Sequence, residues 1–444
     1  MARKQMLIGM HFGNGYGSQP GAWRMPGVDP RSYTNFDAQV RYAQAAERGK
    51  LQFLFVPDFP ALKGEVATEP PSITMDPMIT LAAVARGTER IGLVATGSTT
   101  FNEPYNLARQ FKALDLLSHG RAGWNAVPTS DPAIAANYGR ELPPRAEKYQ
   151  RLHESVQIVQ ALWGSWEADA WLHDVASGRF ADPAKIRPIN LQGQFVGARG
   201  PLPLPPSEQG QPLIFQAGGG DQGLEVAGHY ASGVIGATYT IEDARAERMA
   251  LRDAAERAGR DPDEIKFFPG LMTTIAPDRR AGLDRRIAVS GHPFRQRAAY
   301  LGQMLGLRLD PSRLDEPLSP AQLAAARPSP FDPRSAHALT IAREGWTLRD
   351  VLAHGVIDYH PVIAGPAVEA ADHMQAWFEA GAADGFWVSP DVYEDGIDAF
   401  VDQVVPILQE RGLFHRDYEG TTLRDHLGAP AQYGLDARIL ATAS

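Results

Sequence analysis

The feature that most constrains the fold of this chain is a regular alternation of short apolar runs with helical patterns. Apolar runs of strand length occur at Leu7–Phe12, Leu51–Asp58, Ile91–Ser98, Ala122–Val127, Leu213–Ala217, Val234–Tyr239, Ile265–Thr274 and Gly385–Pro390. A segment with a helical pattern follows each run, and this alternation is typical of parallel β/α structure. Eight such units favour a TIM barrel, a (β/α)₈ fold, in one domain over 1–444. An open, doubly wound sheet shares the alternation and remains the alternative.

Two helical segments carry local signals. Thr34 stands three residues before Asp37 and predicts a capping box at the start of the helix over 35–50. Pro406 lies inside the last helical pattern, 396–412, and predicts a kink there.

Two long segments interrupt the alternation. The segment 167–212 is rich in proline and glycine, and 278–365 has short helical patterns between proline-rich joints. Loops of this length usually serve as lids or binding loops. The second segment joins the seventh strand to the seventh helix, so we expect it at the carboxyl ends of the strands, where barrel enzymes have their active sites. The first segment is equally compatible with a contact between subunits or with no function.

Composition excludes several functional classes. The net charge is −9 without a basic block, so a nucleic-acid surface is not expected. The chain has no cysteine, its 12 histidines lack the spacing of metal ligands, and hydrolase and Walker A motifs are absent. No apolar run approaches the roughly 18 residues of a membrane span, and the N-terminal run is too short for a signal peptide. We therefore expect a soluble, cytoplasmic protein without a metal.

Polar residues at the strand ends predict a ligand-binding rim. Asp58, Thr96 and Asn125 end the second, third and fourth strands, and His11 lies near the end of the first. Asp58 could orient a ligand or cap a loop. His11 is the one candidate for an acid or base, against the alternative of a packed core histidine. Trp23, in the loop after the first strand, could form an aromatic wall or only anchor that loop.

Two further segments predict a phosphate site. The run Gly218–Gly223 matches GxGxxG, follows a strand and opens a helix, so its backbone N–H groups, at Gly219 and Gly220 among them, could face an anion. Arg145 and Tyr149 share a helix face in the preceding unit. Both segments could meet at one phosphate in a barrel. In an open sheet, the same glycines would indicate an NAD-binding enzyme of the Rossmann type.

The chain resembles the flavin-dependent monooxygenases of the bacterial-luciferase-like superfamily, in the branch of the nitrilotriacetate, EDTA and dibenzothiophene-sulfone monooxygenases. The similar segments are GAWR (21–24), FLFVPD (53–58), ATGSTTFNEPYNLARQFKALDLLSHGRAGWNAVPTS (95–130), LWGSWEADAW (162–171), FQAGGGDQG (215–223), GAADGFWVSP (381–390), FVDQVVPILQERGLF (400–414) and LRDHLG (423–428). They span nearly the whole chain in the order of the family.

The resemblance implies a TIM barrel that binds reduced FMN supplied by a separate NAD(P)H-dependent flavin reductase. O₂ would react with the flavin to give a flavin peroxide, which oxygenates a small organic substrate. Asp58, Thr96 and Asn125 match family residues around the flavin ring, and Tyr149 matches a phosphate contact. Departures are Arg145 where the family commonly has histidine, Gly219 and Gly220 where it often has serine, and an additional Pro128.

An apolar wall of Met10, Phe55 and Ile235, closed by the segment 278–365, would then keep water from the flavin. We expect a homodimer or homotetramer. A deazaflavin-dependent oxidoreductase on the same barrel and a non-catalytic flavin-binding barrel are the alternatives. The identity of the substrate does not follow from the sequence.

Overall fold

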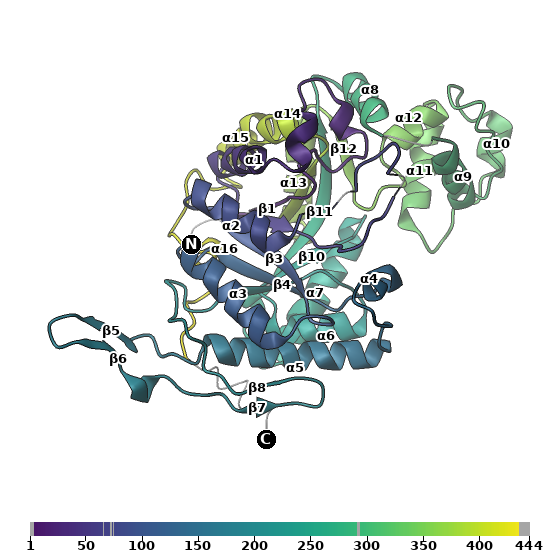
Figure 1. Cartoon of the computed structure of the whole chain (residues 1–444). Helices are drawn as coiled ribbons and strands as arrows, with labels where there is room; N and C mark the ends of the chain where they lie inside the picture. The colour runs from purple at the N-terminus through teal and green to yellow at the C-terminus, as the bar shows by residue number, and fades with distance from the viewer. Residues whose placement is uncertain (1–3, 65, 72, 74, 291–293, 435–444) are drawn as a thin grey trace.

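Eight parallel strands pair edge to edge around a closed ring in the computed structural model of the chain (Figure 1). They are β1 (Leu7–His11), β2 (Phe53–Val56), β3 (Gly92–Ser98), β4 (Ala122–Val127), β9 (Leu213–Gln216), β10 (Gly233–Gly236), β11 (Lys266–Ile275) and β13 (Gly385–Pro390). Leu7 of β1 lies opposite Gly385 of β13, so the ring is closed and the open sheet is excluded. The predicted TIM barrel is confirmed. The structure describes residues 4–64, 66–71, 73, 75–290 and 294–434.

Helices surround the ring of strands. They are α1 (Phe36–Arg48), α2 (Pro77–Gly87), α3 (Pro104–Leu117), α5 (Arg145–Trp163), α6 (Asp221–Tyr230), α7 (Ile241–Arg257), α13 (Ala367–Glu379), α14 (Tyr393–Ala399) and α15 (Val405–Glu410). The predicted capping box at Thr34 is wrong, because the side chain of Asn35 caps α1 by accepting from the N–H of Asp37 at 3.0 Å. Before Pro406, the helix widens into a π-helical turn over Phe400–Val404, which accommodates the proline.

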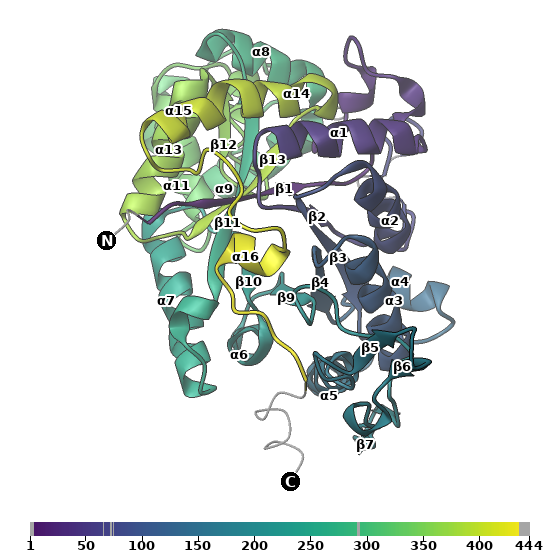
Figure 2. The same ribbon diagram turned by 90° about the vertical axis from the view of Figure 1, so that its left-hand side faces the viewer.

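Successive strand residues alternate between two apolar layers. Phe53 and Phe55 of β2 point into the barrel, where they pack with Phe215 and Phe268, while Leu54 packs in the outer layer beneath the helices. The helix α16 (Leu423–Leu427) contributes two leucines to the inner cluster and lies in the middle of the ring in Figure 2. It closes the amino end of the barrel, so the interior is open to a ligand from the carboxyl end.

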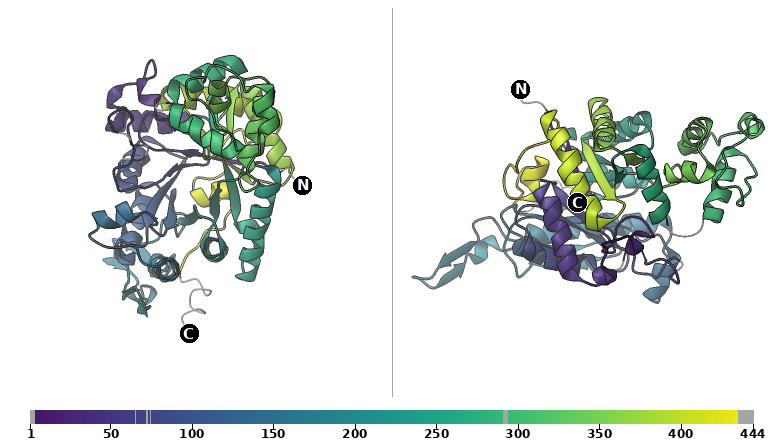
Figure 3. Two further views of the ribbon diagram at one scale, coloured as in Figure 1. Left: turned by 90° about the vertical axis from the view of Figure 1, so that its right-hand side faces the viewer. Right: turned by 90° about the horizontal axis from the view of Figure 1, so that it is seen from above.

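The two predicted insertions take different forms. The segment 167–212 makes a hairpin of β5 (Trp171–Asp174) and β6 (Arg179–Ala181), followed by the short pair β7 (Leu191–Gln192) and β8 (Gly197–Ala198). The hairpin projects from the body on the side opposite the helical insertion (Figures 1 and 3).

The second insertion lies between β11 and α13, as predicted. It contains α8 (Arg279–Val289), α9 (Phe294–Leu305), α10 (Pro320–Ala325), α11 (Pro333–Arg343), α12 (Leu348–Ala353) and β12 (Val362–Gly365). The helices α9, α11 and α12 enclose an apolar cluster of their own. The strand β12 pairs with the end of β11, which returns the chain to the carboxyl face of the barrel.

Candidate active site

A cavity of about 550 Å³ lies at the carboxyl ends of the barrel strands. Of the residues predicted for the site, those that line it are Asp58, Thr96, Asn125, Gly219, Phe55 and Ile235. The strands deliver their terminal side chains to the same edge of the barrel because all of them run in the same direction. The strand ends β2, β3, β4 and β10 therefore meet around one space.

Thr96 and Asn125 form a hydrogen-bonded pair in the wall of this cavity. The two residues lie opposite each other in β3 and β4, and the Asn125 Nδ2 donates to the Thr96 Oγ1 at 2.9 Å. This bond fixes the amide, and the Asn125 Oδ1 is buried without a partner in the described part of the chain. A buried acceptor without a partner is costly, by about 1–3 kcal/mol. An N–H group of a bound ligand would satisfy it.

Arg145, Tyr149 and the start of α6 meet beside the cavity. The Arg145 guanidinium stacks over the Tyr149 ring, 5.1 Å from its centroid, and its Nε donates to the Gln222 Oε1 at 3.0 Å. The Arg145 Nη2 would lie 3.1 Å from a Cβ at Gly220, so the guanidinium stands at the N-cap of α6. A forked cation and free backbone N–H groups at a helix start together suit a phosphate.

The glycines of this loop leave the room that an anion needs. Gly220 has φ +78°, in the left-handed region that favours glycine, and a Cβ at Gly219 would meet nothing within 4 Å. Gly218 and Gly219 also line the cavity, so the phosphate corner and the cavity are continuous. A phosphorylated ring compound with N–H groups fits both features, and reduced FMN has this chemistry.

Asp58 is one of three acidic residues that line the cavity, with Asp131 and Glu247. Burial raises its pKa to about 6, and the charge of Asp76 adds to the shift, against a hydrogen bond from the backbone of Phe59. The carboxyl therefore changes its charge close to neutral pH. It can serve as a hydrogen-bond donor or acceptor for a ligand in the cavity.

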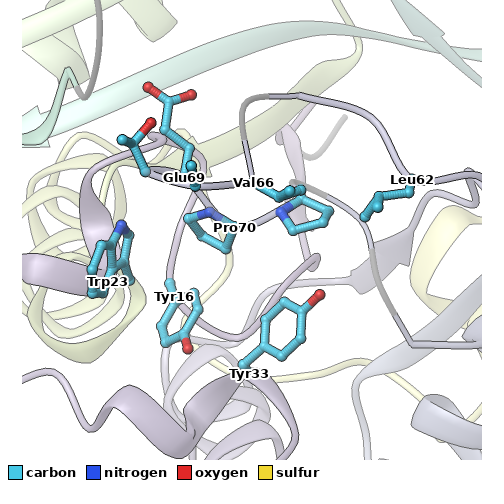
Figure 4. Close-up of a pocket in the computed structure, with 10 residues that line it drawn as sticks. Tyr16, Trp23, Tyr33, Leu62, Val66, Glu69 and Pro70 are labelled. Carbon is cyan, nitrogen blue, oxygen red and sulfur yellow. The ribbon is translucent and has the colours of Figure 1, made fainter.

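Two of the predicted pocket residues lie elsewhere. Met10 does not line the cavity, because it points out of the barrel and is buried under the helices with Ile8 and Phe12. The strand alternation makes His11, not Met10, the inward residue. Trp23 lines a second cavity, formed by the segments after β1 and β2 (Figure 4).

His11 lies behind the wall of the cavity. Its Nδ1 is 2.8 Å from the Tyr393 hydroxyl, and its ring packs edge-on against Trp387 with the centroids 5.2 Å apart. Burial lowers its pKa to about 4, so the imidazole is neutral at physiological pH. This geometry favours the packed, hydrogen-bonded histidine over a general acid or base.

Sequence reasoning missed the residues that the second insertion supplies. Tyr359 and His360 line the cavity together with Trp387 of β13. His360 is 4% exposed and packs against Trp387 with the ring centroids 5.3 Å apart. Its Nδ1 has no hydrogen-bond partner within the described ranges. Burial and the nearby His11 lower its pKa to about 4. The sequence showed where the insertion begins and ends, but no sequence pattern indicates which of its residues lie over the barrel.

Asp358 anchors this part of the insertion. The Asp358 carboxylate pairs with Arg286 and Arg297, and its backbone carbonyl accepts from the Tyr239 hydroxyl, just beyond β10. These bonds hold the adjacent Tyr359 and His360 at the barrel mouth.

Within the described residues, no group of three or more histidine and acidic side chains could hold a metal ion. None of the helices in this part of the chain has the length and hydropathy to cross a membrane.

The chain is a parallel β/α barrel with a cavity at the carboxyl ends of its strands. The family model described as luciferase-like monooxygenase matches residues 10–384, and the chain belongs to this family.

Individual relatives cover almost the whole chain. The N-acetyl-S-(2-succino)cysteine monooxygenase of Bacillus subtilis is 38% identical, over 96% of this chain and 97% of its own. Component A of the nitrilotriacetate monooxygenase of Aminobacter aminovorans is 36% identical over the same shares. Among solved structures, a riboflavin lyase with modified FMN and riboflavin is 28% identical, with a TM-score of 0.77 over 96% of this chain and 97% of that one.

Proposed function

We propose that the protein binds reduced FMN at the mouth of the barrel and uses O₂ to oxygenate a small organic substrate. The observation that carries this proposal is the continuity of the phosphate corner at Arg145 with the cavity at Asn125. The similarity to a component A and to a structure with modified FMN supports it. A separate flavin reductase would supply the reduced cofactor by oxidising NAD(P)H. Because NAD(P)H is a cytoplasmic reductant, we expect the reaction to take place in the cytoplasm.

The chain's own residues have defined tasks in this proposal. Arg145, Tyr149 and the N-terminus of α6 hold the phosphate, while Thr96 and Asn125 bind polar groups of the ring. When bound, the reduced flavin supplies the electrons that activate O₂, of which one oxygen atom enters the substrate and the other leaves as water.

The remaining cavity wall excludes water from the reacting atoms. Phe55, Ile235 and Trp387 form its apolar part, and Tyr359 and His360 cover it from the insertion. Asp58 holds or releases a proton at the edge of the cavity, with its pKa at about 6.

A charge reversal at Arg145 tests the phosphate corner. We expect Arg145→Glu to weaken the binding of reduced FMN by at least about tenfold, because a carboxylate then faces the phosphate in place of a charged donor. The measurement is an anaerobic titration of the protein with reduced FMN, followed by flavin fluorescence. Arg109→Glu on the exposed face of α3 makes the same charge change and should leave the affinity unaltered. Equal affinities in both variants would contradict the assigned site.

A further inference from the structure

A second cavity, of about 400 Å³, lies beside the barrel mouth (Figure 4). The rings of Tyr16, Trp23 and Tyr33 form one wall, from the segment after β1. The segment after β2 forms the other wall, with Leu62, Val66, Ala67, Thr68, Glu69, Pro70 and Pro71. The strands β1 and β2 are parallel neighbours, so both segments start from the carboxyl face of the barrel.

The aromatic wall is held in place independently of any ligand. Tyr16 and Tyr33 stack with centroids 5.9 Å apart, and the Tyr16 hydroxyl donates to the Pro30 carbonyl at 2.5 Å. Tyr16 also packs in a small apolar cluster with Val289 of α8 and Val392 after β13. The Asn14 Nδ2 donates to the Pro71 carbonyl at 3.1 Å and so ties the opposite wall to the first. A preformed wall of this kind favours a flat ligand, since the rings need no ordering on binding.

The polar groups of the second cavity, at Trp23 and Glu69, indicate which charge and which hydrogen-bonding group a ligand should carry. The Trp23 Nε1 is buried and has no hydrogen-bond partner among the residues that the structure describes, and a ligand acceptor would satisfy it. Glu69 is the one charged residue among the ten that line the cavity, and its carboxylate is turned away from the three rings in Figure 4. A lining without a cation cannot hold the phosphate of FMN, and the negative charge of Glu69 disfavours an anionic ligand.

One segment of the chain contributes to the walls of both cavities. The segment after β2 lines the first cavity with residues 57–60 and the second with 62 and 66–71. On the other side, Glu69 attracts Arg297, which donates to Asp358 at 2.9 Å, directly before Tyr359 and His360. Neighbouring elements therefore build both cavities.

We propose that the second cavity is a substrate subsite for a flat, uncharged apolar group that carries a hydrogen-bond acceptor for Trp23. The part of the substrate to be oxygenated would extend to the first cavity. This inference rests on the proposed function, and it names the chemical class of the substrate.

A fluorescent ketone tests the subsite directly. The probe is 6-propionyl-2-dimethylaminonaphthalene, a flat and uncharged compound, titrated into the full-length protein. We expect saturable binding with blue-shifted emission, and no displacement by FMN. Trp23→Phe retains the ring but removes the donor, and should weaken binding about threefold to tenfold. Leu62→Asp should weaken it at least as much, since it adds a charge to the cavity wall.

Leu117→Asp is the matched control, because Leu117 at the end of α3 is 67% exposed and Leu62 is 75% exposed. It should leave the affinity for the ketone unchanged, and equal melting temperatures of the variants show that each is folded. The subsite would be overturned if neither Trp23→Phe nor Leu62→Asp changed the affinity for the ketone. It would also be overturned if FMN displaced the ketone. Equal affinity for 6-dimethylamino-2-naphthoate would overturn the preference for an uncharged ligand.

The same samples, titrated anaerobically with reduced FMN, separate this inference from the proposed function. Normal binding of reduced FMN with no binding of the ketone counts against the subsite alone. Binding of the ketone without binding of reduced FMN counts against the proposed function.

Discussion

One half-buried carboxyl group, Asp58, links the chemistry of the cavity to pH. The ordinary pKa of an aspartate is 3.8, whereas burial and the charge of Asp76 raise that of Asp58 to about 6. Between these two values the folded protein keeps a proton that the unfolded chain has released. The free energy of unfolding therefore decreases as the pH rises through this interval, and the decrease is complete above the folded-state pKa.

Asp58→Asn should remove this pH dependence from the stability of the protein without flavin. We expect wild type to lose about 1 kcal/mol relative to Asp58→Asn between about pH 4 and pH 7. Two pKa units correspond to about 2.7 kcal/mol, and partial solvation of the carboxyl reduces this value. Urea unfolding across this range measures the difference. An Asp253→Asn variant, changed at an exposed position on α7, should follow wild type. Parallel profiles of Asp58→Asn and wild type would contradict the raised pKa.

Single residues also show how much of the site was readable from the sequence. Thr96 and Asn125 could be predicted because each lies near the carboxyl end of a strand of regular length, and adjacent parallel strands place such residues side by side. Met10 was predicted to face the barrel interior, but it faces the helices. Side chains alternate along a strand, so an error of one residue reverses the direction of a side chain. Trp23 and His360 depend on long loops, whose path follows from tertiary contacts rather than from a local pattern.

At the level of elements, the second insertion packs closely against β11 because β11 has a glycine, Gly270, at the point of contact. Gly270 of β11 faces the His360 ring so closely that a Cβ at this position would overlap the imidazole. The ring also packs edge-on against Trp387, the residue opposite Gly270 in β13, so it is held in place by both strands. A glycine in this strand makes room for a residue of the insertion.

Gly270→Ala should therefore destabilise the protein by about 1–3 kcal/mol, the usual cost of an overpacked core. In a His360→Ala background the same substitution should cost much less, because the space is then free. The double-mutant cycle, measured by urea unfolding, isolates the contact between the strand and the insertion. Additive effects of the two substitutions would show that His360 does not occupy the space above Gly270.

The same elements explain why the fold was easier to predict than the site. The eight strands were found because their inner and outer faces are both buried, which gives continuous apolar runs. The helices of the insertion were recognised from short helical patterns in the sequence. The sequence did not show that they pack around Leu301 and Val351, or where this cluster lies relative to the barrel.

For the whole molecule, the barrel acts as a rigid frame and the two insertions as additions at opposite ends (Figure 3). The amino end is closed by α16, and the carboxyl end holds both cavities. The barrel and its carboxyl face could be predicted from the alternation of strands and helices in the sequence. The proposed cofactor and the proposed oxygenation reaction rest on the family and on the phosphate corner at Arg145.

The central claim is that the protein transfers one oxygen atom from O₂ with flavin reduced by another protein. Its most direct test is product mass under ¹⁸O₂, with a flavin reductase, NADH and FMN, across a panel of small organic compounds that includes flat, uncharged ones. We predict a product with one ¹⁸O atom, formed only when reductase, NADH and FMN are all present. Product formed with NADH alone, or with oxygen that comes from labelled water, would contradict the claim.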